Sequence, residues 1–412
     1  MKDFVFDAIF LDRDRLRAFC SRTETPFFLY DAETIRHRAV ELRTALSFCR
    51  FLLQVPVSAA PNPQLLRLLF ENGYGAVCIS EAEVRYAQIA GFPKGKITVL
   101  AHQVTRLPQD AGNYILEELT QAPLLPEDGM IGLRLSAGVR TVPGQVTAVE
   151  AGRLQFGMQE EALMSAAETL MARGATGVGL HCQLGVNHLE EEYLAFVAEI
   201  LFSLAVRLWK RGIPVPYCDL GGGMGWSSQP QIPSPRLERM TAMIRSAYES
   251  ILVPAGLSGL EIRLQPGRYL LAPAGILVSR VVSVRQNGRL FLGLDTSSGD
   301  MLRPMMRNAY HHISILGKNG MDGRQICDVT GWLQEPGDRL GKRRLLPGAE
   351  LGDICILHDA GAYCQSISTN YGGNLRCAEY LLDGEIRLIR RRETVEDCLQ
   401  TLIPAEAEQM CR

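Results

Sequence analysis

Residues 51–69 read FLLQVPVSAAPNPQLLRLL, the pattern of a buried strand followed by a short turn and a helix. The apolar run over 51–57 is typical of a strand. Asn62 supplies an N-cap and Pro63 a first-turn proline for the helix. The leucines that this helix is expected to bury are Leu65, Leu66, Leu68 and Leu69. The pattern therefore places Ser58 at the carboxyl end of a strand.

The alternation of strand and helix continues over the first two thirds of the chain. Helical patterns fill most gaps between the apolar runs, and one of them opens with the capping box Ser80-Glu-Ala-Glu83. Eight runs alternating with helices predict a (β/α)8 barrel. The runs lie near residues 52–57, 76–79, 97–100, 113–116, 131–136, 178–182, 217–220 and 261–265.

After Ala272 the pattern changes to strands with a period of two. Residues 276–284 and 290–294 have this period, and Asn287-Gly288 between them is typical of a hairpin turn. We therefore expect an α/β chain, in which a TIM-like barrel is followed by a C-terminal, mostly β domain. The boundary lies near residue 271.

Composition indicates a two-domain soluble enzyme. The chain has 412 residues, of which 47% are hydrophobic and 21% charged. Lys and Arg number 43 against 45 Asp and Glu, without a basic block, so we expect no nucleic-acid partner. We expect no membrane span and a cytoplasmic location, because Glu199 and Arg207 interrupt the most apolar helix and residues 1–5 lack a signal-peptide core. Eleven scattered cysteines predict reduced thiols and no metal site.

Motifs in the right order along nearly the whole chain resemble those of the pyridoxal-phosphate (PLP) decarboxylases. This is the ornithine and diaminopimelate decarboxylase group, with an alanine-racemase-like fold. The resembling segments are 25–31 (opening strand), 51–62 (around Tyr-Ala-Val-Lys-Ala-Asn), 219–225 (glycine-rich phosphate loop), 265–268 (Glu-Pro-Gly-Arg), 302–305 (Leu-Arg-Pro) and 359–363 (Gly-Ala-Tyr). The resemblance implies a ligand-binding barrel over 32–271 and a β domain formed by 1–31 and 272–412.

The phosphate site of the family is retained. Gly221, Gly222 and Gly223 follow a strand and can bring bare N–H groups to an anion. At the family positions, Arg268 can add a charged fork and Tyr363 a hydroxyl. We predict that these five residues bind a phosphate or another anion.

The electronic machinery of the family is changed. Ser58 replaces the lysine that holds PLP as an imine, and Gln265 replaces the carboxylate opposite the pyridine nitrogen. Gln183 replaces the histidine that stacks on the cofactor ring. PLP is the cofactor that the resemblance implies, but covalently bound PLP is not expected here.

Three further positions depart from the family. Val77 replaces an aspartate, Val186 a phosphate-binding serine, and Gln334 lies in the segment 329–335 that in the family crosses the dimer interface. We expect a homodimer in which Gln334 and Glu335 reach the barrel of the partner. The candidate catalytic residues are Ser58, Gln183, Gln265, Gln334 and Glu335.

Other chemical groups receive structural interpretations. His181 and Cys182 are strand neighbours, so they do not face the same side and are not expected to form a nucleophile pair. The pairs His311-His312 and His358-Asp359 are interpreted as structural polar groups, and Asp219 as a residue that orients the glycine loop. No other lysine is expected at a strand's carboxyl end.

Three functions are compatible with this altered pocket. The first is a repurposed enzyme that acts on an amino-acid-like or phosphorylated small molecule without a covalent cofactor. The second is a non-catalytic relative that binds a ligand or serves as a partner subunit. The third is a residual PLP decarboxylase, a carboxy-lyase like the family. The amide side chains that replace charged groups favour the first function.

Overall fold

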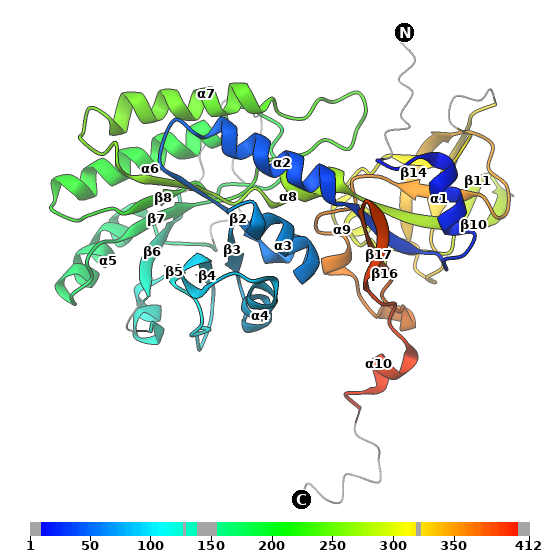
Figure 1. Ribbon diagram of the computed structural model, residues 1–412, viewed down its shortest axis with the longest axis horizontal. Helices are drawn as coiled ribbons and strands as arrows, with labels where there is room; N and C mark the ends of the chain where they lie inside the picture. The colour runs from blue at the N-terminus through cyan, green and yellow to red at the C-terminus, as the bar shows by residue number, and fades with distance from the viewer. Residues whose placement is uncertain (1–9, 127–128, 138–154, 319–322, 403–412) are drawn as a thin grey trace, which may run out of the picture. The chain divides into compact units, whose positions relative to one another are not determined.

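The computed structural model describes residues 10–126, 129–137, 155–318 and 323–402. The chain divides into two compact units, one formed by Ala32–Pro273 and the other by Met1–Asp31 with Ala274–Arg412 (Figure 1). We refer to them as the barrel unit and the sheet unit. Within the ranges described, no helix is both long enough and apolar enough to cross a membrane.

Eight parallel strands of the barrel unit close into a barrel in sequence order. Each predicted apolar run forms one strand, so the predicted (β/α)8 barrel is confirmed. Helices α5, α6 and α7 lie outside the strands (Figure 1). The strands are β2 (Phe51–Pro56), β3 (Gly75–Cys78), β4 (Ile97–Ala101), β5 (Asn113–Leu116), β6 (Met130–Leu135), β7 (Gly179–Cys182), β8 (Tyr217–Asp219) and β9 (Glu261–Leu264).

The turn after β2 forms as its sequence predicts. Val57–Ala59 make one short 3-10 turn, η1, which carries Ser58. The Asn62 side chain then accepts a hydrogen bond from the Gln64 N–H at 3.0 Å, and Pro63 begins α3. The helices of this unit are α2 (Ala32–Ala45), α3 (Pro63–Glu71), α4 (Glu81–Ala90), α5 (Glu160–Ala172), α6 (Tyr193–Lys210), α7 (Leu237–Ala247) and α8 (Gly267–Leu271).

An aromatic side chain fills the interior of the barrel. The Tyr217 side chain occupies the space that a Cβ would need at Gly132 or Gly179. A Cβ at Gly132 would lie 2.3 Å from its hydroxyl oxygen, and one at Gly179 would lie 2.2 Å from its ring carbon Cζ. The Arg263 guanidinium lies 3.6 Å from the Tyr217 ring centroid and donates to Asn113 Oδ1 at 3.1 Å. These side chains are buried, so they close the amino-terminal half of the barrel and leave its carboxyl end for a ligand site.

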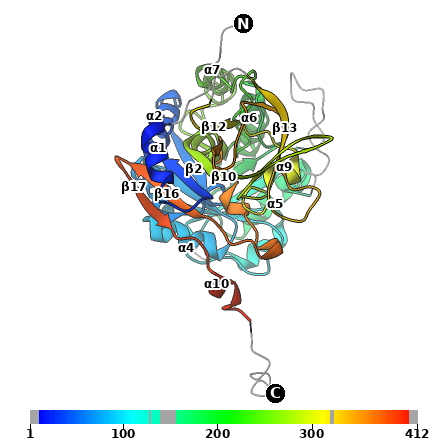
Figure 2. The same ribbon diagram turned by 90° about the vertical axis from the view of Figure 1, so that its right-hand side faces the viewer.

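The described residues of the sheet unit form nine strands. The N-terminal strand β1 pairs antiparallel with β10 and parallel with β16, in the strand order β14-β13-β11-β10-β1-β16-β17. Figure 2 shows β16 and β17 as neighbours at one edge. The predicted hairpin forms at Asn287-Gly288, where Gly288 has φ +66°.

The strands of the sheet unit are β1 (Phe27–Asp31), β10 (Gly275–Asn287), β11 (Arg289–Leu294), β12 (Ile313–Ile315), β13 (Gln325–Thr330), β14 (Arg339–Leu346), β15 (Ile354–Leu357), β16 (Ala378–Asp383) and β17 (Glu385–Arg390). Its helices are α1 (Arg13–Cys20), α9 (Arg303–Arg307) and α10 (Val395–Leu399). Phe19, Phe27 and Tyr380 pack edge to face in the core that joins α1 to the sheet.

The close contact between Gly179 and Tyr217 predicts a stability effect. Gly179→Ala should lower the free energy of unfolding by about 1–3 kcal/mol, because its methyl group would overlap the buried ring. Urea unfolding followed by circular dichroism measures this change. Combining it with Tyr217→Leu should recover part of the loss. Gly95→Ala is the control, because no atom lies within 4 Å of the Cβ added there. Equal losses from both alanine variants would contradict the expectation.

Candidate functional site

The carboxyl rim of the barrel brings together side chains from seven strands. Arg134, His181 and Asp219 are register partners on β6, β7 and β8, so they face the same side of the barrel wall. Enzymes with this fold place their chemistry at this end. Following the same alternation around the barrel gives the rim side chains Val77, His102, Glu117, Arg134, His181, Asp219 and Gln265.

Ser58 completes the rim on the turn after β2, and its side chain is partly buried. No described lysine of the barrel unit takes its place. Lys94 and Lys96 precede β4 at the opposite end of the barrel, where Lys96 Nζ donates to the Gly73 carbonyl at 3.2 Å. Lys210 is the last residue of α6, outside the barrel. The structure therefore has a hydroxyl group, and no described amine, at this place on the rim.

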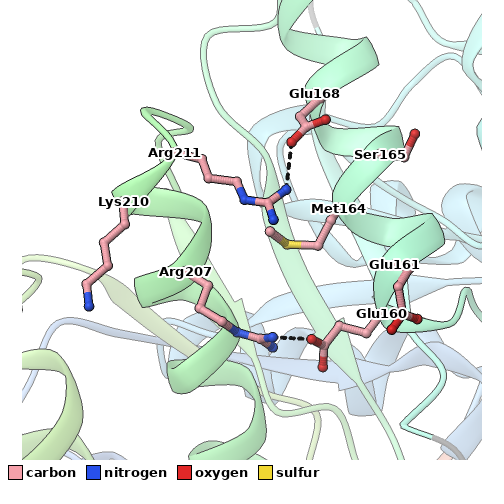
Figure 3. A pocket seen from close by; sticks show the side chains of 8 residues that line it. All are labelled: Glu160, Glu161, Met164, Ser165, Glu168, Arg207, Lys210 and Arg211. Atoms are coloured by element: carbon pink, nitrogen blue, oxygen red, sulfur yellow. Dashed lines mark hydrogen bonds and ion pairs between the residues drawn. The ribbon is translucent and has the colours of Figure 1, made fainter.

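A groove between α5 and α6 forms part of the outer surface (Figure 3). Ion pairs hold most of its charges: Arg211 donates to Glu168 at 2.8 Å, and Arg207 contacts Glu160. The Lys210 side chain points away from both pairs (Figure 3). None of the residues that line the groove belongs to a barrel strand, so we assign no chemistry to it.

The glycine loop after β8 has the backbone of an anion cradle. Gly221 and Gly223 have φ of +67° and +95°, a conformation that favours glycine. A Cβ at Gly222 would lie 2.9 Å from the Gln265 carbonyl oxygen, so the segment that leads into Arg268 lies directly beside the loop. Within the described part of the chain, the N–H groups of Gly222 and Gly223 have no hydrogen-bond acceptor. Two unpaired N–H groups at this position can bind an anion.

The loop after β7 braces the glycine loop. The His188 N–H donates to the Gly223 carbonyl at 2.8 Å, and the Gly225 N–H donates to the His188 carbonyl at 2.8 Å. Gln183 lies beside the glycines, since a Cβ at Gly222 would approach its amide to 3.9 Å. Val186 is 49% exposed. The cradle is therefore held rigidly, but Val186 adds no hydroxyl donor to it.

The Gln265 side chain is hydrogen-bonded to a buried carboxylate. Its Nε2 donates to Asp219 Oδ2 at 2.8 Å, and the Gly221 N–H donates to Asp219 Oδ1 at 2.8 Å. Burial raises the pKa of Asp219, although these two hydrogen bonds lower it. Asp219 thus orients the glycine loop, as predicted. One of the two amide N–H groups of Gln265 is therefore already in use by the protein.

His181 is fully buried, and neither ring nitrogen has a partner in the regions described. Burial, and to a lesser degree the nearby Arg134 charge, hold the pKa of His181 well below its usual range. The imidazole is therefore neutral. It lies beneath the glycine loop, since a Cβ at Gly221 would come within 3.3 Å of its Nε2.

The sequence interpretation missed three rim residues that form one network. Arg134 and His102 contact the two carboxylate oxygens of Glu117. Glu117 and Arg134 are both buried, whereas the His102 side chain is 33% exposed. His102 directly follows β4, and Glu117 directly follows β5. A polar residue immediately after an apolar run is the signal that could have identified these two, whereas Arg134 lies within β6.

Arg268 lies on α8 of the barrel unit, and the other remaining predicted site residues belong to the sheet unit. Gln334 is exposed, and Glu335 is partly buried and accepts a hydrogen bond from the Gly337 N–H at 3.4 Å. The buried Asp338 fixes their loop by accepting from the Leu333 N–H at 2.8 Å. Glu335 and Asp338 line a cavity of about 550 Å³. Tyr363 has φ +55°. That Tyr363 binds the anion, and that Gln334 and Glu335 reach a partner, remain predictions.

The histidines of the sheet unit have structural partners. His311 Nδ1 donates to the His358 carbonyl at 2.9 Å, and His358 Nε2 bonds to the Ser314 hydroxyl at 2.8 Å. Burial lowers the pKa of His358 to about 3 and that of His312 to about 4. These rings are therefore neutral at physiological pH.

The Gln265–Asp219 contact predicts a pH-dependent loss of stability. Gln265→Glu would place a second carboxylate against the buried Asp219, so one of the two must keep a proton in the folded state. A carboxyl group whose pKa is raised in the folded state lowers the free energy of unfolding at neutral pH. This loss of stability shrinks as the pH falls toward the ordinary carboxyl pKa of about 4. We expect a loss of about 1–3 kcal/mol at neutral pH, measured by urea unfolding at several pH values. Gln64→Glu on the exposed start of α3 is the control. A similar pH dependence in both variants would refute this coupling.

Comparisons with known proteins agree with this architecture. A family model described as pyridoxal-dependent decarboxylase, C-terminal sheet domain, matches residues 20–361. Diaminopimelate decarboxylase of Methanothermobacter thermautotrophicus is 29% identical over 389 residues, which cover 91% of each chain. Protein TabA of Pseudomonas amygdali pv. tabaci is 31% identical over 392 residues, which cover 90% of each chain.

Solved structures share the fold over almost the whole chain. Diaminopimelate decarboxylase of Helicobacter pylori in complex with L-lysine superimposes with a TM-score of 0.83 at 24% identity, covering 93% of this chain and 98% of that one. The lysine/ornithine decarboxylase of Vibrio vulnificus in complex with putrescine has a TM-score of 0.77 at 18% identity, covering 90% of this chain and 98% of that one. With the match of the family model, this chain belongs to the pyridoxal-dependent decarboxylase family of the ornithine, diaminopimelate and arginine enzymes.

Proposed function

We propose that this chain binds an anionic small molecule derived from an amino acid at the carboxyl rim of its barrel, and acts on it without a covalently attached cofactor. The observation that carries the proposal is Ser58 at the position of the family lysine, on the turn after β2. A hydroxyl cannot form the carbon–nitrogen double bond through which a lysine holds PLP. Any ligand of this site is therefore held by non-covalent contacts.

The residues fit one end of PLP and not the other. The unpaired N–H groups of the glycine loop suit its phosphate. Ser58 would offer the aldehyde of PLP a hydroxyl, where a lysine would be needed to hold it. The pyridine nitrogen would lack a charged partner at 265, where the neutral amide donates one hydrogen bond to Asp219. PLP bound as in the family therefore does not fit, whereas a ligand with a phosphate or carboxylate group does.

The names of the related structures support an amino-acid-derived ligand. The Helicobacter pylori enzyme was solved with L-lysine and the Vibrio vulnificus enzyme with putrescine. The first ligand is an amino acid, and the second is a diamine. We propose a ligand of the first class, because the rim of this chain retains an anion cradle and a buried cationic side chain, Arg134.

A second candidate function is a non-catalytic binding protein or partner subunit. Two apolar replacements favour it: Val77 is buried on β3, and Val186 is exposed beside the glycine loop. The linked polar residues His102, Glu117 and Arg134 favour the enzyme instead. Such a network is costly to bury and is common at functional sites.

The proposal predicts opposite outcomes for binding and for covalent attachment. Pyridoxamine 5′-phosphate, which has an amine in place of the aldehyde, should bind the purified protein in equilibrium dialysis. PLP followed by borohydride should leave no stoichiometric phosphopyridoxyl-lysine on any barrel peptide, because none of the described rim residues is a lysine. Arg268→Gln should weaken pyridoxamine phosphate binding by about tenfold, through loss of one charged hydrogen bond.

Matched variants control this experiment. Arg67→Gln removes an exposed arginine from α3 and should leave binding unchanged. Ser58→Lys should become labelled by PLP and borohydride, yet show no measurable decarboxylation of ornithine, lysine, arginine or diaminopimelate. Gln265→Glu and Gln183→His should then improve retention in a non-additive manner. Stoichiometric labelling of the natural protein, or robust turnover by Ser58→Lys alone, would overturn the proposal.

We also expect the homodimer that the family resemblance implies. The loop with Gln334 and Glu335 is anchored by Asp338, which accepts from the N–H groups of Leu333 and Ser298 at 2.8 and 2.7 Å. An anchored loop with an exposed tip is suited to contact a second subunit. Light scattering at micromolar concentration should give twice the chain mass of 45.5 kDa. A monomeric mass at that concentration would refute the expectation.

A further inference from the structure

We propose that His102, oriented by Glu117, is the proton-transfer group of this barrel. His102 and Glu117 directly follow β4 and β5, so both lie at the carboxyl rim. His102 Nδ1 bonds to one oxygen of Glu117, and Arg134 binds the other. Within the described chain, no group bonds to His102 Nε2. This inference rests on the proposed function, because it assigns a role within the same site.

The Gln121 side chain fixes the backbone that carries His102 and Glu117. Gln121 is buried, and its Oε1 accepts from the N–H groups of Glu117 and Glu118 at 2.9 and 3.3 Å. Its Nε2 donates to the carbonyl of Ala101 at 3.1 Å, one residue before His102. A single side chain thus links the ends of β4 and β5. This support holds His102 and Glu117 in a constant relative position.

An aromatic ring covers the pair. The Phe156 ring centroid lies 4.7 Å from that of His102, and the Arg134 guanidinium carbon lies 4.6 Å from the Phe156 centroid. Phe156 therefore contacts the two side chains that flank Glu117. It restricts the imidazole to one orientation and removes water from one side of the ion pair.

The other acidic and basic groups of the rim are already in use or inaccessible. Asp219 accepts two hydrogen bonds and is fully buried. His181 is fully buried, and its pKa lies well below its usual range. Glu117 is held by Arg134 on one side and His102 on the other. Among the described rim residues, His102 combines an ionisable ring, partial exposure and an oriented nitrogen.

The proton transfer balances without a further reactant. Nε2 of the neutral imidazole takes a proton from an acidic X–H group of the ligand, and the electron pair of the broken bond stays on X. The imidazolium that forms is paired with the Glu117 carboxylate. Return of the proton to the ligand restores the starting state. Arg134 holds Glu117 in place and is therefore a positioning residue.

The barrel topology defines the class of ligand. Strand β4 precedes His102 and β8 precedes the glycine loop, and four steps separate these strands in the closed order of eight. The two groups therefore lie across the barrel mouth from each other. A ligand that uses both has an anionic group at one end and a proton-bearing carbon, nitrogen or oxygen toward the other.

Chemical modification tests this assignment without knowledge of the substrate. Diethyl pyrocarbonate acylates unprotonated imidazole nitrogens, and peptide mass spectrometry locates the products. At neutral pH we expect His102 to be modified, and saturating pyridoxamine 5′-phosphate to slow its modification at least severalfold. His37, exposed on α2, is the internal control and should react at the same rate with and without this probe.

Glu117→Gln separates this proposal from the proposed function. The variant should slow the modification of His102 by roughly tenfold, because the carboxylate no longer fixes the tautomer, and should leave His37 unaffected. If folding of the variant is impaired, the nitrogen-15 spectrum of the natural protein decides: Nδ1 should carry the proton and Nε2 none. The proposal is overturned by an unreactive His102, by the opposite tautomer, or by bound probe that gives no protection. Failure of the probe to bind refutes the anion site instead, and the Glu117→Gln rates and the spectrum then judge His102 alone.

Discussion

One buried carboxylate organises the candidate site. Asp219 has no exposed surface, and its two oxygens accept from the Gly221 backbone and from the Gln265 side chain. The strands β8 and β9, the glycine loop and the segment leading to Arg268 therefore share one electrostatic centre. Because a carboxylate without donors is costly to bury, each of these elements is constrained by the others. The shape of the anion cradle follows from this constraint.

The buried Asp219 also explains why an amide suits position 265. An acid at 265 would face a buried acid across a hydrogen-bond distance, unless a positively charged ligand atom separated the two. An amide needs no such ligand, since it donates to Asp219 directly. The Asp219–Gln265 pair therefore needs no cationic ring between its members to satisfy this hydrogen bond. Ser58 is consistent with this arrangement, because a lysine would add a charge that no described rim carboxylate is free to neutralise.

Local sequence patterns predicted the fold because every element is encoded within a few residues. The eight apolar runs, the Asn62-Pro63 helix start and the Asn287-Gly288 turn each depend on short-range chemistry, and each forms. The candidate site was predicted in part, through the motifs around Ser58, Gly221 and Gln265. The contacts among His102, Glu117 and Arg134 were not, because they depend on strand register. That register becomes definite only when the barrel closes, which brings together residues from three separate strands.

The Tyr217 ring determines through which end of the barrel a small molecule can reach the interior. Together with Arg263 and Asn113 it fills the lower half of the interior, and its ring leaves no room for side chains at Gly132 and Gly179. The interior of the barrel is thus closed at its amino-terminal end and open at its carboxyl end. Any small molecule that enters the interior must therefore enter and leave through the carboxyl end. Amino-acid changes at 132, 179 and 217 are coupled for the same reason, since a larger residue at either glycine demands a smaller one at 217.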